Sequence, residues 1–273
     1  MNPIGRLSRD LRDLRWGQVG VELLLLVLGI LIALAIDDWM QDRRDAQTER
    51  QNLDGIVRDL DRDLLVLKEF GAYHDSQTAD GIMVYRALRS EADVKDKEGV
   101  AQAVSRLISR RTLRLSHPTY SNLVGTGSIS LIRNTELRDR IVGLYEANER
   151  WATIIDRNNL VFVDQMFAEY LLSSGLIAPR PTNSLQSLQR LDAQFDERMG
   201  VPVGVSNDRL WRFAASSPER EILANKVWYR TLISSRYRTQ ADEITRDVTA
   251  VRQAIVDELE RRWPRAKPPA ATG

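Results

Sequence analysis

An uninterrupted apolar run near the N-terminus limits what this chain can fold into more than any other feature. Residues 19–36 contain one charged side chain, Glu22, and residues 23–36 contain none. A helix of this length spans about 27 Å, close to the hydrocarbon thickness of a bilayer. A helix that packs on the core of a water-soluble protein has one polar face, on which polar residues repeat about every 3.6 positions. This run has no such face. The run therefore predicts a transmembrane helix over residues 17–36.

A cleaved signal peptide is the alternative to a retained anchor. Ala33, Leu34 and Ala35 resemble a signal-peptidase site after an apolar run. Signal peptides begin with a positively charged region, whereas Asp10 and Asp13 stand among the arginines here. The apolar run also continues beyond the alanines. We therefore expect the segment to be kept as a signal-anchor.

Charged residues on both sides of the span indicate its orientation. Four arginines precede the span: Arg6, Arg9, Arg12 and Arg15. After the span come three aspartates, Asp37, Asp38 and Asp42, and then three arginines, Arg43, Arg44 and Arg50. The positive-inside rule then favours a cytoplasmic N-terminus. In a Gram-negative bacterium this would be an inner-membrane protein with a periplasmic domain. Trp16 and Trp39 bracket the span as interfacial anchors. The charge bias is small, so a domain facing the cytoplasm is the alternative.

Two further patterns near the membrane suggest contacts. Residues 1–16 space leucine and isoleucine at helical intervals between arginines, which predicts an amphipathic segment on the cytoplasmic leaflet, with a frayed tail as the alternative. Gly29 and Ala33 form a small-xxx-small pair that lets two helices approach closely, and Glu22 falls near the same face. These three residues predict a helix–helix interface in the membrane. Alternatively, Glu22 simply reaches the membrane surface.

Beyond the span the pattern predicts an all-α domain over residues 37–263. Leu53, Val57, Leu60, Leu64 and Leu67 follow the spacing of a coiled-coil seam. The membrane helix is therefore expected to continue as a stalk to Phe70 and to turn at Gly71. Helices over about 73–90 and 97–115 follow, and Pro118 starts a short helix.

The second half is predicted to contain two long helices. Asn134 or Thr135 caps the first, which ends at Gly175 and buries the face made by Leu137, Ile141, Leu144, Asn148, Trp151, Ile155, Phe162 and Met166. A short helix over about 184–198 and a turn around 200–205 lead to the last helix, from Ser217 to Trp263. Its apolar stripe is Ile244, Val248, Val251, Ile255 and Leu259. We expect the first and last exported helices to pack antiparallel, and residues 264–273 to form a disordered tail.

Composition excludes several kinds of chemistry. The chain has no cysteine, so thiolate metal sites and disulfides are impossible. Lys+Arg number 39 against 38 Asp+Glu, which gives no basic excess for nucleic acid. The two histidines, His74 and His117, lie far apart without metal-ligand spacing. We therefore predict no catalytic residues, no metal, no cofactor and no enzymatic activity.

Three motifs have some of the features of binding sites. Gly125-Thr126-Gly127-Ser128 fails the phosphate-loop patterns and is expected to be a helix end and tight turn. Asp59, Asp61 and Asp63 alternate, so on a helix they cannot converge on one ion. Arg106, Arg110 and Arg114 share one face of the predicted helix at i, i+4 and i+8, which suggests contact with an anion or lipid headgroup. The alternative is a solvated face paired with nearby acids.

Two stretches together resemble a known family. Residues 28–44, "LGILIALAIDDWMQDRR", carry a Gly-Ile-x-Ile-Ala-Leu core, a tryptophan and a basic helix, through Gly29, Ile30, Ala33, Leu34 and Trp39. Residues 119–146 add Tyr120, Leu123, Gly127, Leu131, Ile132, Asn134, Leu137, Arg138 and Tyr145. The two motifs in this order resemble the uncharacterised bacterial membrane-protein family known as domain of unknown function 6090. The resemblance lies in the first part of the chain and is weak beyond about residue 180. The resemblance implies a retained single anchor, a helical exported domain and no assigned activity.

Taken together, these patterns predict a single-pass membrane protein whose role is non-enzymatic. We expect an interaction, assembly or accessory subunit that forms a homo-oligomer or binds a membrane-protein partner. The alternative is a periplasmic domain that senses a ligand in a pocket near Arg106, Arg110 or Trp151 and acts through a membrane partner. A hydrolase is disfavoured because the motifs of hydrolases are absent from the sequence.

Overall fold

The regular structure of the chain is helical throughout the part that the structure describes. A computed structural model describes residues 16–90, 94–176, 207–215 and 217–264, and no strand occurs among them. The all-α prediction is therefore confirmed. The predicted amphipathic segment before Trp16, the helix over 184–198, the turn around 200–205 and the tail beyond Pro264 lie outside the described residues.

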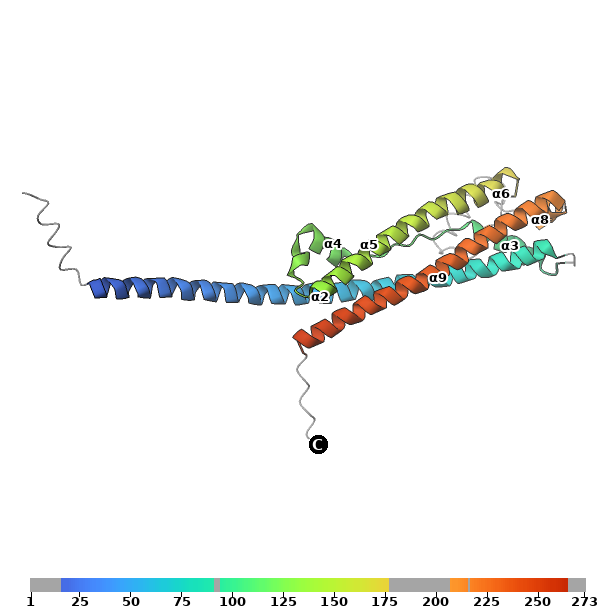
Figure 1. The fold of residues 1–273 in the computed structure, drawn as a ribbon. Helices are drawn as coiled ribbons and strands as arrows, with labels where there is room; N and C mark the ends of the chain where they lie inside the picture. Colours follow the sequence, from blue (N-terminus) through green and yellow to red (C-terminus); the bar gives the residue numbers. More distant parts are fainter. Residues whose placement is uncertain (1–15, 91–93, 177–206, 216, 265–273) are drawn as a thin grey trace, which may run out of the picture.

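The N-terminal helix α2 (Trp16–Arg89) is a single element that contains both the apolar run and one long side of the domain (Figure 1). The predicted turn at Gly71 and the separate helix over 73–90 are therefore wrong. A glycine inside a helix costs about 1 kcal/mol relative to alanine, which packing along a long helix offsets. A side-chain Cβ at Gly71 would lie 3.3 Å from the Arg238 guanidinium, so the glycine makes room for this neighbour.

The remaining helices fold back along the outer half of α2. They are α3 (Lys97–Ile108), α4 (Pro118–Gly125), the short 3-10 helix η1 (Ser128–Leu131), α5 (Thr135–Asn158), the π-helix η2 (Asn159–Ala168), α6 (Glu169–Ser173), α8 (Asn207–Ala214) and α9 (Ser217–Arg262). Asn134 caps α5 by accepting a hydrogen bond from the Leu137 amide, as predicted. Gly175 has a φ of +70° just beyond α6, which fits its predicted role at the end of this helix.

Helices α2 and α9 pack antiparallel over the full length of the domain (Figure 1). Three ion pairs mark the register: Asp61–Arg252 at 2.5 Å, Asp75–Arg238 at 2.9 Å and Arg89–Glu221 at 3.2 Å. Residue numbers rise along α2 and fall along α9, so the predicted pairing is confirmed. The end of α9 returns to the part of α2 that follows the apolar run, where Arg262 lies 2.5 Å from Glu49.

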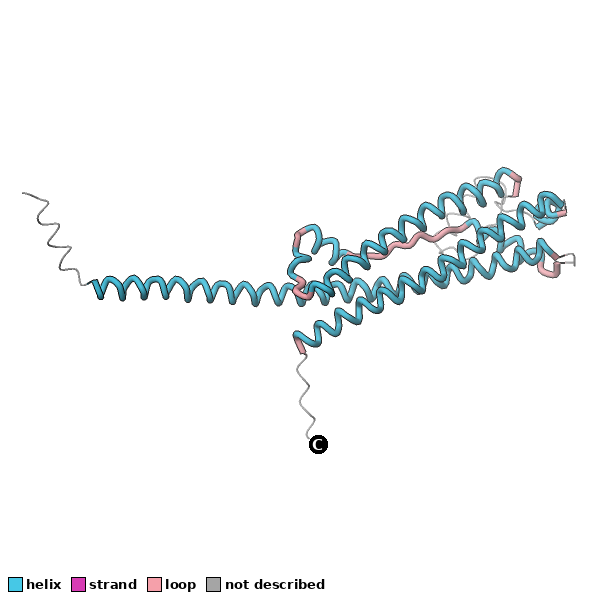
Figure 2. The backbone as a smooth tube through the Cα atoms, in the orientation of Figure 1, coloured by secondary structure: helices cyan, strands magenta, loops and turns pink. Residues whose placement is uncertain are grey.

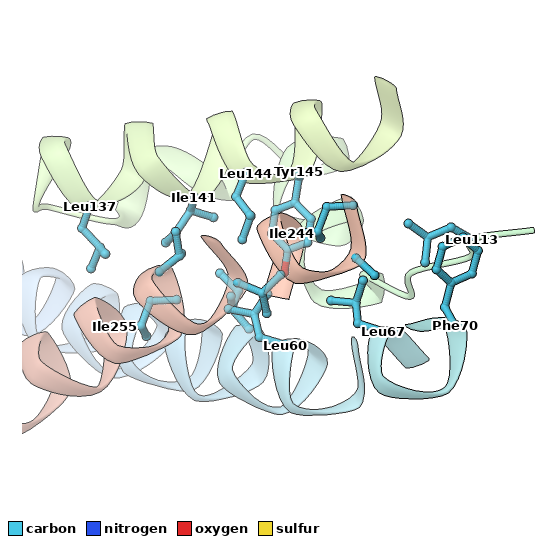
Figure 3. Packing of buried hydrophobic residues seen from close by; sticks show 14 of the residues in the cluster. Leu60, Leu67, Phe70, Leu113, Leu137, Ile141, Leu144, Tyr145, Ile244 and Ile255 are labelled. Atoms are coloured by element: carbon cyan, nitrogen blue, oxygen red, sulfur yellow. The ribbon is translucent and has the colours of Figure 1, made fainter. Parts of the chain in front are cut away.

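The hydrophobic core consists of two clusters at different heights. The cluster nearer the apolar run joins α2, α5 and α9 through side chains that point toward one another (Figure 3), with Leu60, Leu67, Ile141, Ile244 and Ile255 at its centre. Leu53 belongs to it, and Val57 and Leu64 pack against it, so the predicted seam is buried. The outer cluster joins α2, α3, α6, α8 and α9.

The predicted buried face of α5 is confirmed up to the π-helix η2, where the type of helix changes. Ile141, Asn148 and Ile155 are buried, and Trp151 and Phe162 pack against the core. Met166 is 41% exposed, so its predicted burial is wrong. From Asn159 the backbone forms a π-helix, whose wider turn shifts the phase of the side chains. The inward positions there are Asn159, Val163 and Phe167.

Helix α3 ends earlier than predicted. Ser109 is extended (φ −65°, ψ 146°), and residues 109–117 run along the bundle without helical structure (Figure 2). The end of α3 exposes backbone carbonyls that need donors. Arg230 of α9 supplies them: its Nε donates to Leu107 O at 3.0 Å and its Nη2 donates to Ser109 O at 3.0 Å.

Arg230 is the largest fully buried side chain and forms a polar layer between the two hydrophobic clusters. Its guanidinium also donates to Gln77 Oε1 at 2.9 Å and to the Ser234 hydroxyl. Gln77 in turn donates to Arg106 O at 3.0 Å. One buried cation therefore joins α2, the end of α3 and α9 through neutral acceptors.

Replacing Arg230 by methionine should lower the free energy of unfolding by about 3 kcal/mol or more, because several buried acceptors lose their donor. Urea unfolding of the full chain in detergent, followed by circular dichroism, measures this loss. Arg236→Met is the matched control, since Arg236 is exposed on the same helix, and it should change stability by less than about 0.5 kcal/mol. Equal unfolding midpoints for the two variants would show that the polar layer adds nothing to stability.

Candidate functional site

The first candidate site is the surface of the apolar part of α2. An 18-residue window of this helix has a mean hydropathy of 2.5 and contains no buried residue, so α2 is long and apolar enough to span a membrane. Glu22, Gly29 and Ala33 are all exposed. At 3.6 residues per turn they lie on one face of the helix, as predicted. Of the predicted interfacial anchors, Trp39 is 61% exposed with Arg43 over its ring at 5.5 Å, and Trp16 begins the helix.

The predicted arginine face does not exist, because α3 ends at Ile108. Each of the three side chains instead pairs with an acid from another element: Arg106 with Asp80 at 2.6 Å, Arg110 with Asp164 at 3.2 Å and Arg114 with Asp156 at 2.5 Å. Hydrogen bonding to Asp80 raises the pKa of Arg106, so the guanidinium is charged at any physiological pH. Anion or lipid contact by these arginines stays a prediction, now without a shared face to support it.

A polar cluster closes the bundle at the end nearer the apolar run. Glu49 is fully buried and accepts hydrogen bonds from the Arg133 amide at 2.8 Å and from Arg262 at 2.5 Å. Asn134, which caps α5, also donates to Glu258 of α9 at 3.2 Å. The cluster therefore ties the start of α5 and the end of α9 to α2. Its hydrogen bonds serve the fold.

The alternating aspartates divide between two sides of α2, as predicted. Asp61 faces Arg252, whereas Asp59 and Asp63 are buried beneath the start of α4. Asp59 accepts from the Thr119 amide and Asp63 from the Ser116 amide, both at 2.8 Å. Asp59 replaces the partner that an amide in the first turn of α4 lacks, and Asp63 holds the extended segment just before this helix. Gly55, one turn earlier, lets Thr119 approach, because a Cβ there would lie 2.8 Å from its methyl group.

An aromatic and polar cluster adjoins the two aspartates. The rings of Tyr120 and Tyr145 stack at 4.1 Å, and His117 lies 5.2 Å from the Tyr145 ring. Four buried polar atoms of this region find no hydrogen-bond partner within the described parts of the chain: Asp63 Oδ2, His117 Nδ1, Tyr145 Oη and Asn148 Nδ2. Buried polar groups in folded proteins normally have partners, so this concentration marks the region.

A pocket of about 250 Å³ opens beside this cluster between α5 and the extended segment 109–117. Its polar lining is Arg114, His117, Asn148 and Glu149, and its apolar lining is Leu113, Leu115 and Ala152. Glu149 Oε1 lies 3.4 Å from His117 Nε2. We call these seven residues the α5 pocket. Asn148 and Glu149 occupy neighbouring positions on α5, one buried and one exposed.

Burial shifts the pKa of several groups in the domain. It raises the pKa of Asp63 to about 6, partly offset by the Ser116 hydrogen bond and by His117. Burial also lowers the pKa of His74 to about 3, and the charges of Arg230 and Arg111 lower it further. His74 is enclosed by the rings of Phe70, Tyr73 and Tyr237. It is therefore a neutral core residue, not part of the α5 pocket.

Sequence patterns singled out three of the seven residues of the α5 pocket, Arg114, His117 and Asn148, without connecting them. Asn148 was expected on the buried face and His117 at the start of a helix, and both are there. One sequence feature indicates the polar cluster beside the pocket: Asp59 and Asp63 are four residues apart, which puts both on one face of α2. The predicted pocket near Trp151 has a counterpart in a separate groove of about 300 Å³ lined by Trp151, Phe162, Tyr229 and Tyr237, among others. No group of three or more potential metal ligands occurs among the residues searched, which are those the structure describes.

Fold and site together define a helical protein with one helix near its N-terminus that is long and apolar enough to cross a membrane. The chain matches no protein-family model, and no curated protein or solved structure matches it.

Asp63→Asn should make stability less dependent on pH. The folded pKa of about 6 lies above the reference value of 3.8, so the folded state binds more protons between these values and its stability falls as the pH rises through them. Asparagine keeps the oxygen that accepts from Ser116 and removes the buried charge. We expect a gain of about 1–3 kcal/mol at pH 8 and almost none at pH 4. Urea unfolding at both pH values measures the difference. An equal effect at both would contradict a protonated Asp63.

Proposed function

We propose that this protein is a single-pass membrane-anchored interaction or accessory subunit without enzymatic activity. The observation that carries the proposal is the continuity of α2, which extends from the apolar run into the domain without a break. The two long helices of the domain, α2 and α9, are held in register by ion pairs and a buried polar layer. A force or partner acting on the domain would therefore act on the membrane helix directly.

The exposed apolar half of α2 supports a partner within the membrane. Its side chains make no packing contact that buries them against the described domain. A Cβ placed on Gly29 would meet no atom within 4 Å. The face made by Glu22, Gly29 and Ala33 is thus free to contact a second copy or another membrane helix. A carboxylate on that face would be stabilised by a polar group of such a partner.

We further propose that the anchor lies in a bacterial inner membrane, with the domain in the periplasm and the N-terminus in the cytoplasm. The arginine distribution supports this orientation. We also propose that the chain belongs to the family known as domain of unknown function 6090. Membership of that family would imply the same arrangement. Interaction with nucleic acid is not proposed, because the chain has a net charge of +1.

Cysteine labelling tests the orientation directly, because the chain has no cysteine of its own. Ser235 is exposed on α9, so Ser235→Cys should react with a membrane-impermeant maleimide in intact spheroplasts. Ser8→Cys, before the span, should react only after permeabilisation. The reverse pattern would place the domain in the cytoplasm.

Gly29→Leu should weaken assembly in the membrane by about 1–2 kcal/mol, roughly tenfold, because the added side chain separates the two helices. The measurement is the mass of intact complexes extracted in a mild detergent. Gly20→Leu is the matched control: Gly20 is exposed, has no neighbour within 4 Å and lies half a turn away from Gly29. Identical assemblies in wild type and both variants would exclude this face as the interface.

A further inference from the structure

The α5 pocket has the chemistry of a binding site, which goes beyond the proposed interaction role. Asn148 is 4% exposed and lines the pocket, yet its Nδ2 finds no acceptor among the residues described. His117 Nδ1 is likewise buried without a partner there. An amide and an imidazole nitrogen without partners cost stability unless something else satisfies them. Both belong to the lining of one pocket.

Charges of both signs stand on the two walls of the pocket. Arg114 comes from the extended segment and Glu149 from α5. Arg114 is already paired with Asp156 at 2.5 Å, so the rim carries no net excess of cations. A polyanion such as a nucleotide or a sugar phosphate would need several free cations. The rim suits a ligand that carries one positive and one negative group.

Size and lining narrow the ligand further. A volume of about 250 Å³ lies at the small end for ligand pockets, which points to a small organic molecule. Leu113, Leu115 and Ala152 give it an apolar wall. A small aliphatic group fits this wall while two charged ends reach the polar lining.

We propose that the α5 pocket binds a free, neutral, aliphatic α-amino acid of about the size of valine. Its carboxylate accepts hydrogen bonds from Asn148 Nδ2 and from N–H groups of Arg114 other than Nη2, which donates to Asp156 at 2.5 Å. Its ammonium group donates to Glu149, which otherwise lies 3.4 Å from His117. The aliphatic side chain contacts Leu115 and Ala152. No covalent step is involved.

The pocket also has a short route to the membrane helix. His117 follows Ser116, whose amide donates to Asp63 of α2 at 2.8 Å. Tyr145, one turn before Asn148 on α5, packs against His117. A ligand that binds Asn148 and competes with His117 for Glu149 therefore acts on the contact between segment 109–117 and α2.

Calorimetric titration of the full-length protein in detergent with L-valine tests this proposal. We expect saturable binding of one valine per chain. Isovalerate, which lacks the ammonium group, and isobutylamine, which lacks the carboxylate, should each bind at least about tenfold more weakly, because each loses one charged contact. Equal binding of isovalerate and valine would overturn the amino-acid assignment in favour of a simple carboxylate. Absence of saturable heat with valine, alanine and leucine at millimolar concentration would overturn the site.

Variants separate binding at this pocket from binding elsewhere. Glu149→Gln should weaken valine binding roughly tenfold with the fold intact, because the side chain is 67% exposed. Ala152→Leu fills the pocket and should abolish binding. Glu146→Gln is the matched control: its side chain is 63% exposed and lies one turn earlier on α5. Unchanged affinity in both pocket variants, or equal loss in the control, would refute the assignment. The titration needs no membrane partner, so its failure is separate from failure of the proposed assembly.

Discussion

The antiparallel packing of α2 and α9 is the constraint on which the rest of the structure depends. Leu60 and Leu67 of α2 meet Ile244 and Ile255 of α9 in a core that α5 then covers (Figure 3). Exposed ion pairs such as Asp61–Arg252 add little energy by themselves, typically below about 1 kcal/mol. Burial of the seam supplies the stability, and the charged pairs select the register. Since α2 also contains the apolar run, this one pairing fixes how the other described helices lie relative to that run.

The buried layer around Arg230 adds specificity to that pairing. Two continuous apolar stripes slide past each other at small cost, whereas a buried guanidinium has few places where all its donors find acceptors. Gln77 of α2 and the carbonyls at the end of α3 provide them at one register. The same contacts explain why the chain leaves helical structure after Ile108: the carbonyls of the last turn are satisfied by α9 and do not require the helix to continue.

Periodicity predicted the helices well and their boundaries less well. The seam through Leu53 and Leu60, the cap at Asn134 and the pairing of the first and last helices follow from local patterns, and the structure has them. The turn at Gly71 was wrong because a glycine inside a long helix is tolerated where a neighbour needs its space. The exposure of Met166 was missed because a π-helical stretch shifts the phase, and no residue pattern signals it. The first error arises from a tertiary contact, that of Gly71 with Arg238, and the second from a change of helix type.

The α5 pocket and the polar cluster beside it were harder to predict because their members come from three separate elements. Asp63 on α2, His117 before α4 and Asn148 on α5 lie far apart in the sequence, and each has an ordinary local explanation. What distinguishes them is the set of unpartnered polar atoms that the fold collects in one place. The Glu49 cluster differs in that Glu49 Oε1 accepts from two donors and closes the bundle, although Glu49 Oε2 also has no partner among the described residues. The α5 pocket instead combines unsatisfied donors with open volume and a charged rim, and this combination is characteristic of a binding site.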